Sequence, residues 1–430
     1  MLFNRYIDDI KDIFDEQCNP VTITDTNISH FLYADDLVLV SLTPEGLQRS
    51  LDKISLYSKT KSLTISIKKS KSMVFNIGGR LIKTYFNIGG KILEPVKSFC
   101  YLGFEVVASG IVTHAMNILK DKAKKALHPL LSAIAKFDLP AKLSIHLFHT
   151  YISPILLYGV ENWAILSDLD LERFDNVSLF NKIEKSASDI VHRKLLKFVL
   201  GVSKTSHNVA VYGDTGEIPI SLKGYRLMLN YWKRISSLPD KSLAKKALIE
   251  NANIRTNWIK TIEKLLGCFR LRQVPAKKFK DTTKTIIPSY FVLNWKNKLM
   301  NEDISRLNIY KNINNDFTLP KHLGLPYHLR KVISRIRCSS HPLAIEKGRQ
   351  KMIPREERLC TLCEERVVED EEHFLLKCTT YTHLREHHQI NSQNVPEILI
   401  WKTSTNLHTF SSLLWNSDKG YSGGGPGSRA

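Results

Sequence analysis

Apolar and polar residues alternate over short distances in the N-terminal part of the chain, whereas most of the remainder follows a helical repeat. Two short apolar runs, 31–34 and 38–41, flank Asp35 and Asp36, which predicts a β-hairpin with two acids at its turn. A helix is expected after Thr43, because threonine is a favoured N-cap residue. Further strands are predicted at 64–67, 73–77 and 99–107, and a hairpin region at 81–92.

The chain becomes predominantly helical after Gly110. Leu139-Pro140 interrupts one predicted helix, and a second is expected over 141–163. Residues 170–345 also have a mainly helical pattern, divided by prolines. The pattern therefore predicts an α+β protein, in which a small sheet with helices is followed by a mostly helical region.

Composition adds a strong basic bias to this picture. The chain has 430 residues, with 62 Lys and Arg against 42 Asp and Glu, and a formal net charge of +20. Such a surplus points to a polyanionic partner, with nucleic acid as the first candidate and an anionic membrane surface as the second. A hydrophobic content of 43% excludes a mostly disordered chain.

Two features indicate a protein that stays inside the cell. No apolar stretch approaches the about 20 residues needed to span a bilayer, and no signal-peptide core follows Met1, so we expect neither membrane insertion nor secretion. The seven cysteines are an odd number and mostly scattered, which fits a reducing compartment rather than a disulfide framework. We therefore expect an intracellular protein of the nucleus, the cytoplasm or both.

The dipeptide Asp35-Asp36 is the first candidate for chemistry. Two carboxylates inside a buried strand would be costly, but at the tip of a hairpin they can share a hard cation. Mg²⁺ prefers oxygen ligands and is often held by one or two carboxylates together with substrate phosphates. Two such ions can stabilise the attacking and leaving oxygens in phosphoryl transfer. A solvated turn is the alternative interpretation, because aspartate is common in turns.

Residues 33–36, Tyr-Ala-Asp-Asp, resemble the catalytic box of reverse transcriptases, specifically those of non-LTR (LINE-like) retrotransposons. The resemblance continues in order along the chain. Residues 2–10 resemble the segment before the box, residues 63–71 the motif after it, and residues 99–103 the primer-grip hairpin. In the motif after the box, the family usually has asparagine where this chain has Ser66.

The resemblance implies part of a reverse-transcriptase palm with Mg²⁺ bound at its acids. Asp35 and Asp36 would hold the metal, and Lys69 or Lys71 would stabilise charge on the phosphates of the incoming nucleotide. An exposed polar edge is the alternative interpretation of the lysines. The residues expected to contact substrate or primer are Tyr33, Ala34, Tyr101, Leu102 and Gly103.

The family also has a third catalytic carboxylate and a glycine-containing nucleotide pocket, both upstream of the segment that corresponds to residues 2–10. Because the sequence begins at Met1, we expect both to be absent, and Asp8 and Asp9 stand in the wrong place to substitute. A two-metal site that lacks one carboxylate is severely impaired. We therefore expect a truncated reverse transcriptase, inactive as written. The alternative is a non-catalytic, zinc-dependent RNA- or DNA-binding remnant.

A second candidate site lies near the C-terminus and has the spacing C-x₂-C-x₉-H-x₄-C. Its members are Cys360, Cys363, His373 and Cys378. Three thiolates and one imidazole form a standard tetrahedral zinc set with no open position, so the predicted Zn²⁺ is structural. Such a knuckle either stabilises a small subdomain or contacts nucleic acid. A basic approach to it is offered by Arg349, Lys351, Arg355 and Arg358.

We accordingly divide the chain into five regions. They are a partial palm at 1–110, a helical thumb at 111–165, a helical connector at 166–345, a CCHC zinc-knuckle region at 346–400 and a tail at 401–430, disordered at its end. The connector has scattered histidines and no evident catalytic constellation. The expected partners are an RNA template, a DNA primer or target, and nucleotides, while the oligomeric state is left open. Either phosphate contact or solubility explains the thumb lysines, Lys120, Lys122, Lys124 and Lys125.

Overall fold

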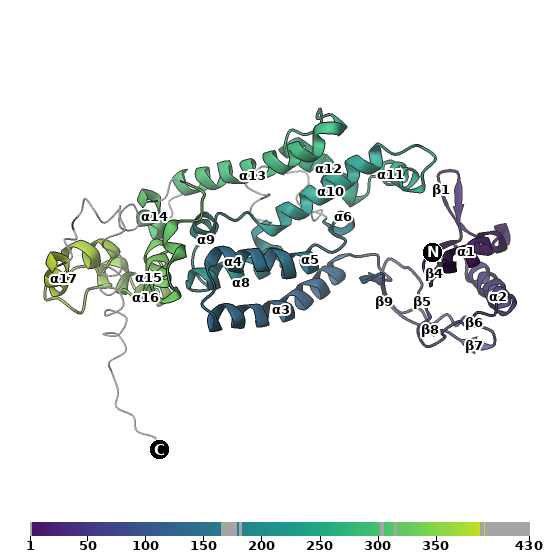
Figure 1. Ribbon diagram of the computed structural model, residues 1–430, viewed down its shortest axis with the longest axis horizontal. Helices are drawn as coiled ribbons and strands as arrows, with labels where there is room; N and C mark the ends of the chain where they lie inside the picture. Colours follow the sequence, from purple (N-terminus) through teal and green to yellow (C-terminus); the bar gives the residue numbers. More distant parts are fainter. Residues whose placement is uncertain are drawn as a thin grey trace, which may run out of the picture. The chain divides into compact units, whose positions relative to one another are not determined.

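The computed structural model describes residues 2–164, 179, 183–301, 305–313, 316–387 and 391 (Figure 1). The chain forms two compact units. Unit 1 comprises residues 1–119, 158–173 and 227–280, and unit 2 comprises residues 120–157, 174–226 and 281–430. The predicted tail at 401–430 lies outside the described residues, and so does most of the chain between 388 and 400. The predicted domain boundaries stay a prediction.

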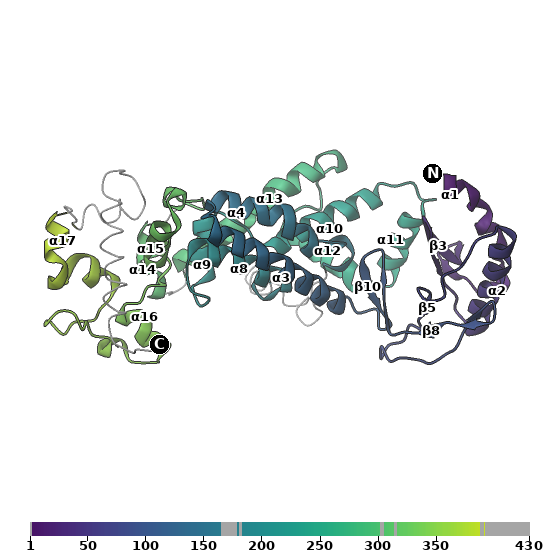
Figure 2. The ribbon, with the colours of Figure 1, turned by 60° about the horizontal axis from the view of Figure 1, so that its bottom comes forward.

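Unit 1 combines short strands with helices (Figure 2), as the α+β prediction required. The strands are β1 (Val21–Ile23), β2 (Thr26–Ile28), β3 (His30–Tyr33), β4 (Asp36–Leu39), β5 (Lys71–Ser72), β6 (Asn87–Ile88), β7 (Lys91–Ile92), β8 (Glu94–Pro95), β9 (Ser98–Tyr101) and β10 (Phe104–Val107). The helices are α1 (Leu2–Tyr6), η1 (Asp8–Ile13), η2 (Glu16–Cys18), α2 (Pro44–Thr60), α6 (Val160–Trp163), α11 (Leu243–Asn253) and α12 (Asn257–Cys268). Helices with residues of both units are α3 (Thr113–Lys136), α10 (Ile220–Ser236) and α13 (Ala276–Asn301).

The predicted acidic hairpin is confirmed, with β3 and β4 paired antiparallel. Tyr33 is opposite Asp36, so Ala34 and Asp35 form the two-residue turn. Ala34 has a φ of 53°, in the left-handed region that the favoured two-residue hairpin turns need at their first position. The two strands start and end one or two residues from the predicted positions, a normal uncertainty for element boundaries.

Helix α2 supplies the apolar face on which this part of unit 1 folds. The Thr43 side chain accepts a hydrogen bond from the Gly46 amide, which confirms the predicted N-cap. Leu51 and Ile54, from the predicted apolar stripe, are buried on the inner face of α2. They form one core with Ile10, Tyr57, Phe86, Ile88 and Leu93, and side chains of β4 pack against it. The core therefore anchors the base of the acidic hairpin.

The region 99–107, predicted as one interrupted strand, is a second hairpin formed by β9 and β10. Its turn residues, Leu102 and Gly103, have φ values of 48° and 80°. Two positive φ values match a type I′ turn, whose twist suits a two-residue hairpin. The Tyr158 hydroxyl donates a hydrogen bond to the Leu102 carbonyl and covers the turn. The hairpin shape expected from the family resemblance is thus present.

Two other predicted strands, 64–67 and 73–77, are not strands in the described structure. Residues 63–67 do alternate between half-buried and exposed, and Ile65 and Ile67 pack against the core around α2. No neighbouring strand pairs with them, and the Ser66 carbonyl instead accepts hydrogen bonds from the next turn of chain. The described strands form separate two-stranded sheets. The alternation over residues 63–67 therefore reflects which side chains face the core, and does not indicate a strand of a larger sheet.

Unit 2 is helical in the described residues. Its elements are α4 (Ala141–Leu147), the π-helix η3 (Phe148–Ile152), α5 (Ser153–Leu156), α8 (Ala187–Leu200), α9 (Asn208–Thr215), η5 (Ser305–Leu307), α14 (Asn308–Ile313), η6 (Lys321–Gly324), α15 (Tyr327–Arg337), α16 (Ala344–Gln350), η7 (Arg355–Glu357), the π-helix η8 (His373–Lys377), η9 (Thr379–Tyr381) and α17 (Thr382–His387). None of the helices that the structure describes combines the length and apolar character required to cross a bilayer.

The helix predicted over 141–163 is broken into α4, η3, α5 and α6. Pro154 has no amide hydrogen and its ring clashes with the carbonyl one turn earlier, so it disfavours a regular α-helix through this point. The wider π turn, η3, lies directly before α5, whose first turn contains Pro154. Gly159 then adopts a left-handed φ of 63° before α6 begins.

A buried ion pair fixes α9 and α15 in unit 2. Arg337 donates hydrogen bonds to both carboxylate oxygens of Asp214, at 2.8 Å and 2.6 Å. The exposed fractions of the two side chains are 2% and 0%. The ring of Tyr310 lies beside the guanidinium, with 5.7 Å between the Arg337 Cζ and the ring centroid. Both charges are therefore satisfied inside the unit.

Candidate functional site

The acidic turn presents its carboxylates to solvent. Asp35 and Asp36 are both exposed, and so are the Tyr33 and Ala34 side chains before them. Their position follows from the β3–β4 register, because the apolar residues of β4 pack inward on the core around α2 while the tip extends beyond it. Two adjacent exposed carboxylates at a hairpin turn can bind a hard cation together with phosphate oxygens.

The β9–β10 hairpin lies within electrostatic reach of this turn. The pKa of the Tyr101 phenol is raised, chiefly by burial and in addition by the negative charge of Asp36. Tyr101 and Asp36 are distant in sequence, so the fold of unit 1 brings them together. The predicted primer-grip tyrosine therefore lies within electrostatic range of Asp36, one of the two predicted metal-binding acids.

The two candidate phosphate-binding lysines differ in their surroundings. Lys71 lies in β5, which pairs in parallel with β8, and its ammonium forms an ion pair with Glu94 of β8. Lys69 precedes this strand on a turn and is exposed. Lys71 therefore has a structural partner, whereas Lys69 is the lysine better placed to reach a ligand.

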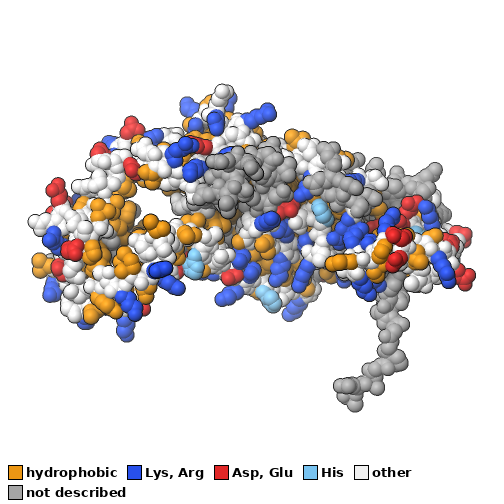
Figure 3. All heavy atoms as spheres, turned by 180° about the vertical axis from the view of Figure 1, so that it is seen from behind, with side chains coloured by type: hydrophobic (Ala, Val, Ile, Leu, Met, Phe, Trp, Pro, Cys, Tyr) orange, Lys and Arg blue, Asp and Glu red, His pale blue; other side chains and the backbone are white. Residues whose placement is uncertain are grey.

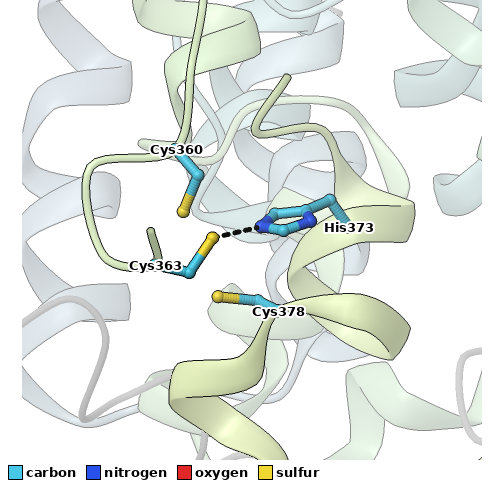
Figure 4. A group of neighbouring side chains, drawn as sticks. All are labelled: Cys360, Cys363, His373 and Cys378. Atoms are coloured by element: carbon cyan, nitrogen blue, oxygen red, sulfur yellow. Dashed lines mark hydrogen bonds between the residues drawn. The ribbon is translucent and has the colours of Figure 1, made fainter. Parts of the chain in front are cut away.

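The four residues of the C-terminal motif converge in unit 2 (Figure 4). Their ligand atoms, three Sγ and one imidazole nitrogen, all lie within 4.8 Å of one another. The Cys363 Sγ is 3.5 Å from the His373 Nε2. In a tetrahedral zinc site with Zn–S of about 2.3 Å and Zn–N of about 2.1 Å, sulfur and nitrogen are about 3.6 Å apart. The observed separation fits that geometry.

Local hydrogen bonds and packing hold the knuckle in shape. The Cys360 amide donates to the Val367 carbonyl at 2.8 Å, and a bridge between Leu359 and Val368 closes the loop that carries the first two cysteines. A short helical turn at 371–372 leads into η8, a π-helix that begins at His373. The next two residues of η8 pack into a core with Ile313, Val332, Ile336, Leu343 and Ile345.

Burial gives this cluster the character of a structural metal site. Cys360, His373 and Cys378 are buried, with Cys363 half-buried. Burial raises the pKa of the Cys360 thiol to about 12. A bound cation would stabilise the thiolates that burial disfavours, with release of protons. The donor set and its geometry are therefore compatible with Zn²⁺, and four protein ligands leave no position for catalysis.

The predicted basic approach to the knuckle is only partly available. Arg358 donates hydrogen bonds to the carbonyls of Ile353 and Ile345, and Arg349 forms an ion pair with Glu346. Arg355 is exposed but pairs with an acid of the knuckle loop, at 2.9 Å from Asp370. Lys351 is exposed at the end of α16. The first three residues have structural roles, which local sequence alone could not reveal.

The helix assigned to the thumb has one buried and one basic face. Ala115, Leu119, Ala123 and Leu127 of α3 are buried at helical spacing. The opposite face exposes Lys122, Lys124 and Lys125, whereas Lys120 is half-buried. Many Lys and Arg side chains are also visible on the face of the molecule drawn in Figure 3.

One cluster in unit 2 was not singled out from the sequence. His149, His192 and Glu217 lie together, with their ligand atoms within 4.8 Å of one another. His149 and Glu217 are 68 residues apart, so no local spacing signals the group. His149 lies in the π-helix η3, a feature that the sequence pattern, which predicted one helix over 141–163, does not reveal.

Comparison with known proteins agrees with the family resemblance. Residues 1–106 match the family described as "Reverse transcriptase (RNA-dependent DNA polymerase)". Over 225 residues the chain is 24% identical to the "Retrovirus-related Pol polyprotein from type-1 retrotransposable element R2" of Popillia japonica. This match covers 49% of the chain and 35% of the relative, so the chain spans about a third of the relative's length. Residues 1–106 are thus similar to a reverse-transcriptase domain, and the chain resembles part of the polyprotein of a non-LTR retrotransposable element.

Proposed function

We propose that this chain serves RNA-directed DNA synthesis by a non-LTR retrotransposable element, with Asp35 and Asp36 binding the catalytic Mg²⁺. The observation that supports this most directly is the exposed acidic hairpin turn, which lies within the segment that matches reverse transcriptases. Mg²⁺ bound by these carboxylates would polarise the phosphates of a nucleotide and lower the barrier to phosphoryl transfer.

The neighbouring elements suit the same reaction. Lys69, exposed on its turn, would stabilise charge on the departing pyrophosphate. The β9–β10 turn of Leu102 and Gly103, with Tyr101 beside it, would hold the primer end next to the metal. Tyr33 and Ala34, which directly precede the two acids, would contact the nucleotide. Each of these groups would then act on an RNA template, a DNA primer or target, or a nucleotide.

We further propose that Cys360, Cys363, His373 and Cys378 bind one structural Zn²⁺. The convergence of the four ligand atoms supports the proposal, as does the burial of three of the four residues. The zinc would keep η8 in place, and thereby its contribution to the core of unit 2. Exposed Lys351 is the nearby cation best suited to contact a nucleic-acid phosphate.

Primer extension tests the proposed polymerase role. The purified chain is supplied with an RNA template, an annealed DNA primer, nucleotides and Mg²⁺, and template-directed incorporation is measured. Because we expect the chain to be inactive as written, incorporation should be low, and whatever is measured should be lost in Asp35→Asn and Asp36→Asn, since each removes a metal ligand. Asp12→Asn, which changes an exposed acid of η1, is the matched control and should leave incorporation unchanged.

A non-catalytic nucleic-acid-binding role is the second candidate. It is favoured by one observation: among the described residues, Asp35 and Asp36 do not belong to a cluster of three or more metal-ligating side chains. In this role the chain binds RNA or DNA with an affinity that falls steeply with salt, in keeping with its net charge of +20. Salt-dependent binding of RNA or DNA without nucleotide incorporation, with the same affinity in Asp36→Asn, would assign this role and reject the polymerase role.

A further inference from the structure

Three metal-ligating side chains meet inside unit 2, well apart in sequence from the cysteine cluster. The His149 Nε2 lies 2.8 Å from the Glu217 Oε2. The His192 Nε2 lies 3.7 Å from the same carboxylate oxygen. Neighbouring ligands at about 2.1 Å from a metal are about 3.0 to 3.4 Å apart, so the two observed separations lie on either side of that range, and small side-chain shifts would bring both into it.

Each side chain comes from a different element. His149 is presented by the π-helix η3, which interrupts the run from α4 to α5. His192 lies in the middle of α8. Glu217 follows α9, immediately after Gly216, which ends that helix with a φ of 62°. π turns are frequent at functional sites, and this one brings a histidine to two other ligand groups.

His192 has an unusual environment for a purely structural residue. Its exposed fraction is 0%, and among the described residues neither ring nitrogen has a hydrogen-bond partner. The ring stacks on Phe148, with 5.0 Å between centroids and 19° between planes. A buried polar atom without a partner costs free energy, so such groups are rare and usually have an explanation. A ligand between His192 and Glu217 would supply the partner of one nitrogen.

We propose that His149, His192 and Glu217 form a second metal site, which binds a divalent transition-metal ion of the Zn²⁺ type. Two imidazoles and one carboxylate are a ligand set that zinc accepts, with three protein ligands and one open position. The His149 and Glu217 side chains are 22% and 18% exposed, so the ion and an exogenous ligand can reach the site from solvent. This proposal is independent of the proposed polymerase role.

The orientation of the two histidines agrees with metal ligation. His149 keeps its Nε2 directed at Glu217, so both histidines face the same carboxylate.

Lys223 of α10 is the group that opposes a cation at this site. Its Nζ lies 3.2 Å from each ring nitrogen of His149 and 3.9 Å from the Glu217 Oε2. The side chain is 27% exposed and can turn toward solvent when a metal takes its place. Lys223 thus competes with the metal for Glu217, which provides a variant expected to strengthen binding.

Metal content tests the proposal. The full chain is stripped with a chelator, reloaded with excess Zn²⁺, freed of unbound metal and analysed for zinc per chain. Glu217→Gln keeps the shape of the side chain and removes its charge, and should bind one Zn²⁺ fewer than the unmodified chain. Glu184→Gln, which alters another partly buried carboxylate of unit 2, is the matched control and should retain the full content. Equal zinc contents in Glu217→Gln and the unmodified chain would overturn the proposal.

Two further readouts separate this site from the cysteine cluster. Co²⁺ bound by thiolates has an intense near-ultraviolet absorption, which a histidine–carboxylate site lacks. Glu217→Gln should leave this absorption unchanged and lose only the visible Co²⁺ bands that belong to the histidine–carboxylate site. Lys223→Met should bind the same number of Zn²⁺ ions with at least 10-fold higher affinity at the second site. An unchanged affinity in Lys223→Met, with normal circular dichroism, would contradict the assigned ligands.

Discussion

The Cys363 Sγ lies 3.5 Å from the His373 Nε2, although the two residues stand at opposite ends of the knuckle loop. The distance is what one tetrahedral ion would require of a sulfur and a nitrogen ligand. His373 opens η8, whose following residues are buried in the core of unit 2. The convergence of the four candidate zinc ligands is thus coupled to the packing of the unit.

The first prediction concerns zinc removal. Cys363→Ser should lower the zinc content by one ion per chain and lower the melting temperature of unit 2 by about 5–10 °C, because the metal contributes to folding. A chelator should have the same effect on the unmodified chain. Calorimetry combined with metal analysis checks both. Cys268→Ser is the control, since Cys268 lies outside the cluster. A chelator that removes zinc without lowering the melting temperature would contradict a structural role.

The second prediction concerns acid stability. Burial lowers the pKa of His322 to about 3, and its Nε2 lies 3.0 Å from the Ser334 Oγ. Unfolded histidine takes up a proton near pH 6.5, so stability contributed by neutral His322 is present above that pH and is lost as the pH falls toward 3. The loss at pH 5.5 should be about 1.4 kcal/mol.

Urea unfolding at pH 7.5 and pH 5.5 measures this loss. His322→Gln should show a correspondingly smaller decrease in the free energy of unfolding between the two pH values. His128→Gln, at an exposed position, should behave as the unmodified chain does. An identical pH dependence in His322→Gln would show that another group carries the effect.

The third prediction concerns the buried ion pair between Asp214 and Arg337. Asp214→Asn should lower the free energy of unfolding by about 3–5 kcal/mol, because Arg337 keeps an uncompensated buried charge. Asp214→Leu combined with Arg337→Met should recover most of this loss, since neither charge remains to be desolvated. Denaturant titration of the single and double variants checks the result. A double variant whose loss equals the sum of the single losses would argue against the pair as the cause.

The fourth prediction concerns the turn of the second hairpin. Gly103 has a φ of 80°, and an added Cβ would lie 3.2 Å from the Tyr158 Oη. Gly103→Ala therefore combines backbone strain with crowding and should lower the melting temperature of unit 1. Gly110→Ala is the matched control, because Gly110 has a φ of 69° with nothing within 4 Å of the added Cβ. Equal melting temperatures of Gly103→Ala and Gly110→Ala would show that Tyr158 does not constrain the turn.

Local features of the molecule could be predicted from the sequence because their causes are local. The acidic hairpin depends on two short apolar runs around Asp35, and helix α2 on its cap at Thr43. The cysteine cluster was recognisable from spacing alone, since C-x₂-C confines two ligands to one loop. Each of these predictions concerns residues that lie close together in the chain.

Features that arise from tertiary packing could not be predicted in this way. The approach of His149 to Glu217 joins residues 68 apart, and the Asp214–Arg337 pair joins residues 123 apart. Alternation over 64–67 indicated a strand, but the partner strand that such a prediction needs is not present among the described residues. The proximity of Tyr101 to Asp36 likewise depends on how two hairpins pack in unit 1.

The most direct test of the central claim is a count of metal ions at Asp35 and Asp36. Mn²⁺ replaces Mg²⁺, and its free concentration is followed by electron paramagnetic resonance in the presence of an RNA–DNA duplex and a nucleotide. We predict Mn²⁺ binding by the zinc-loaded chain that is lost when both Asp35→Asn and Asp36→Asn are introduced, and kept in Asp12→Asn. Equal Mn²⁺ binding by the unmodified chain and the double variant would contradict the assignment of these acids as the catalytic metal ligands.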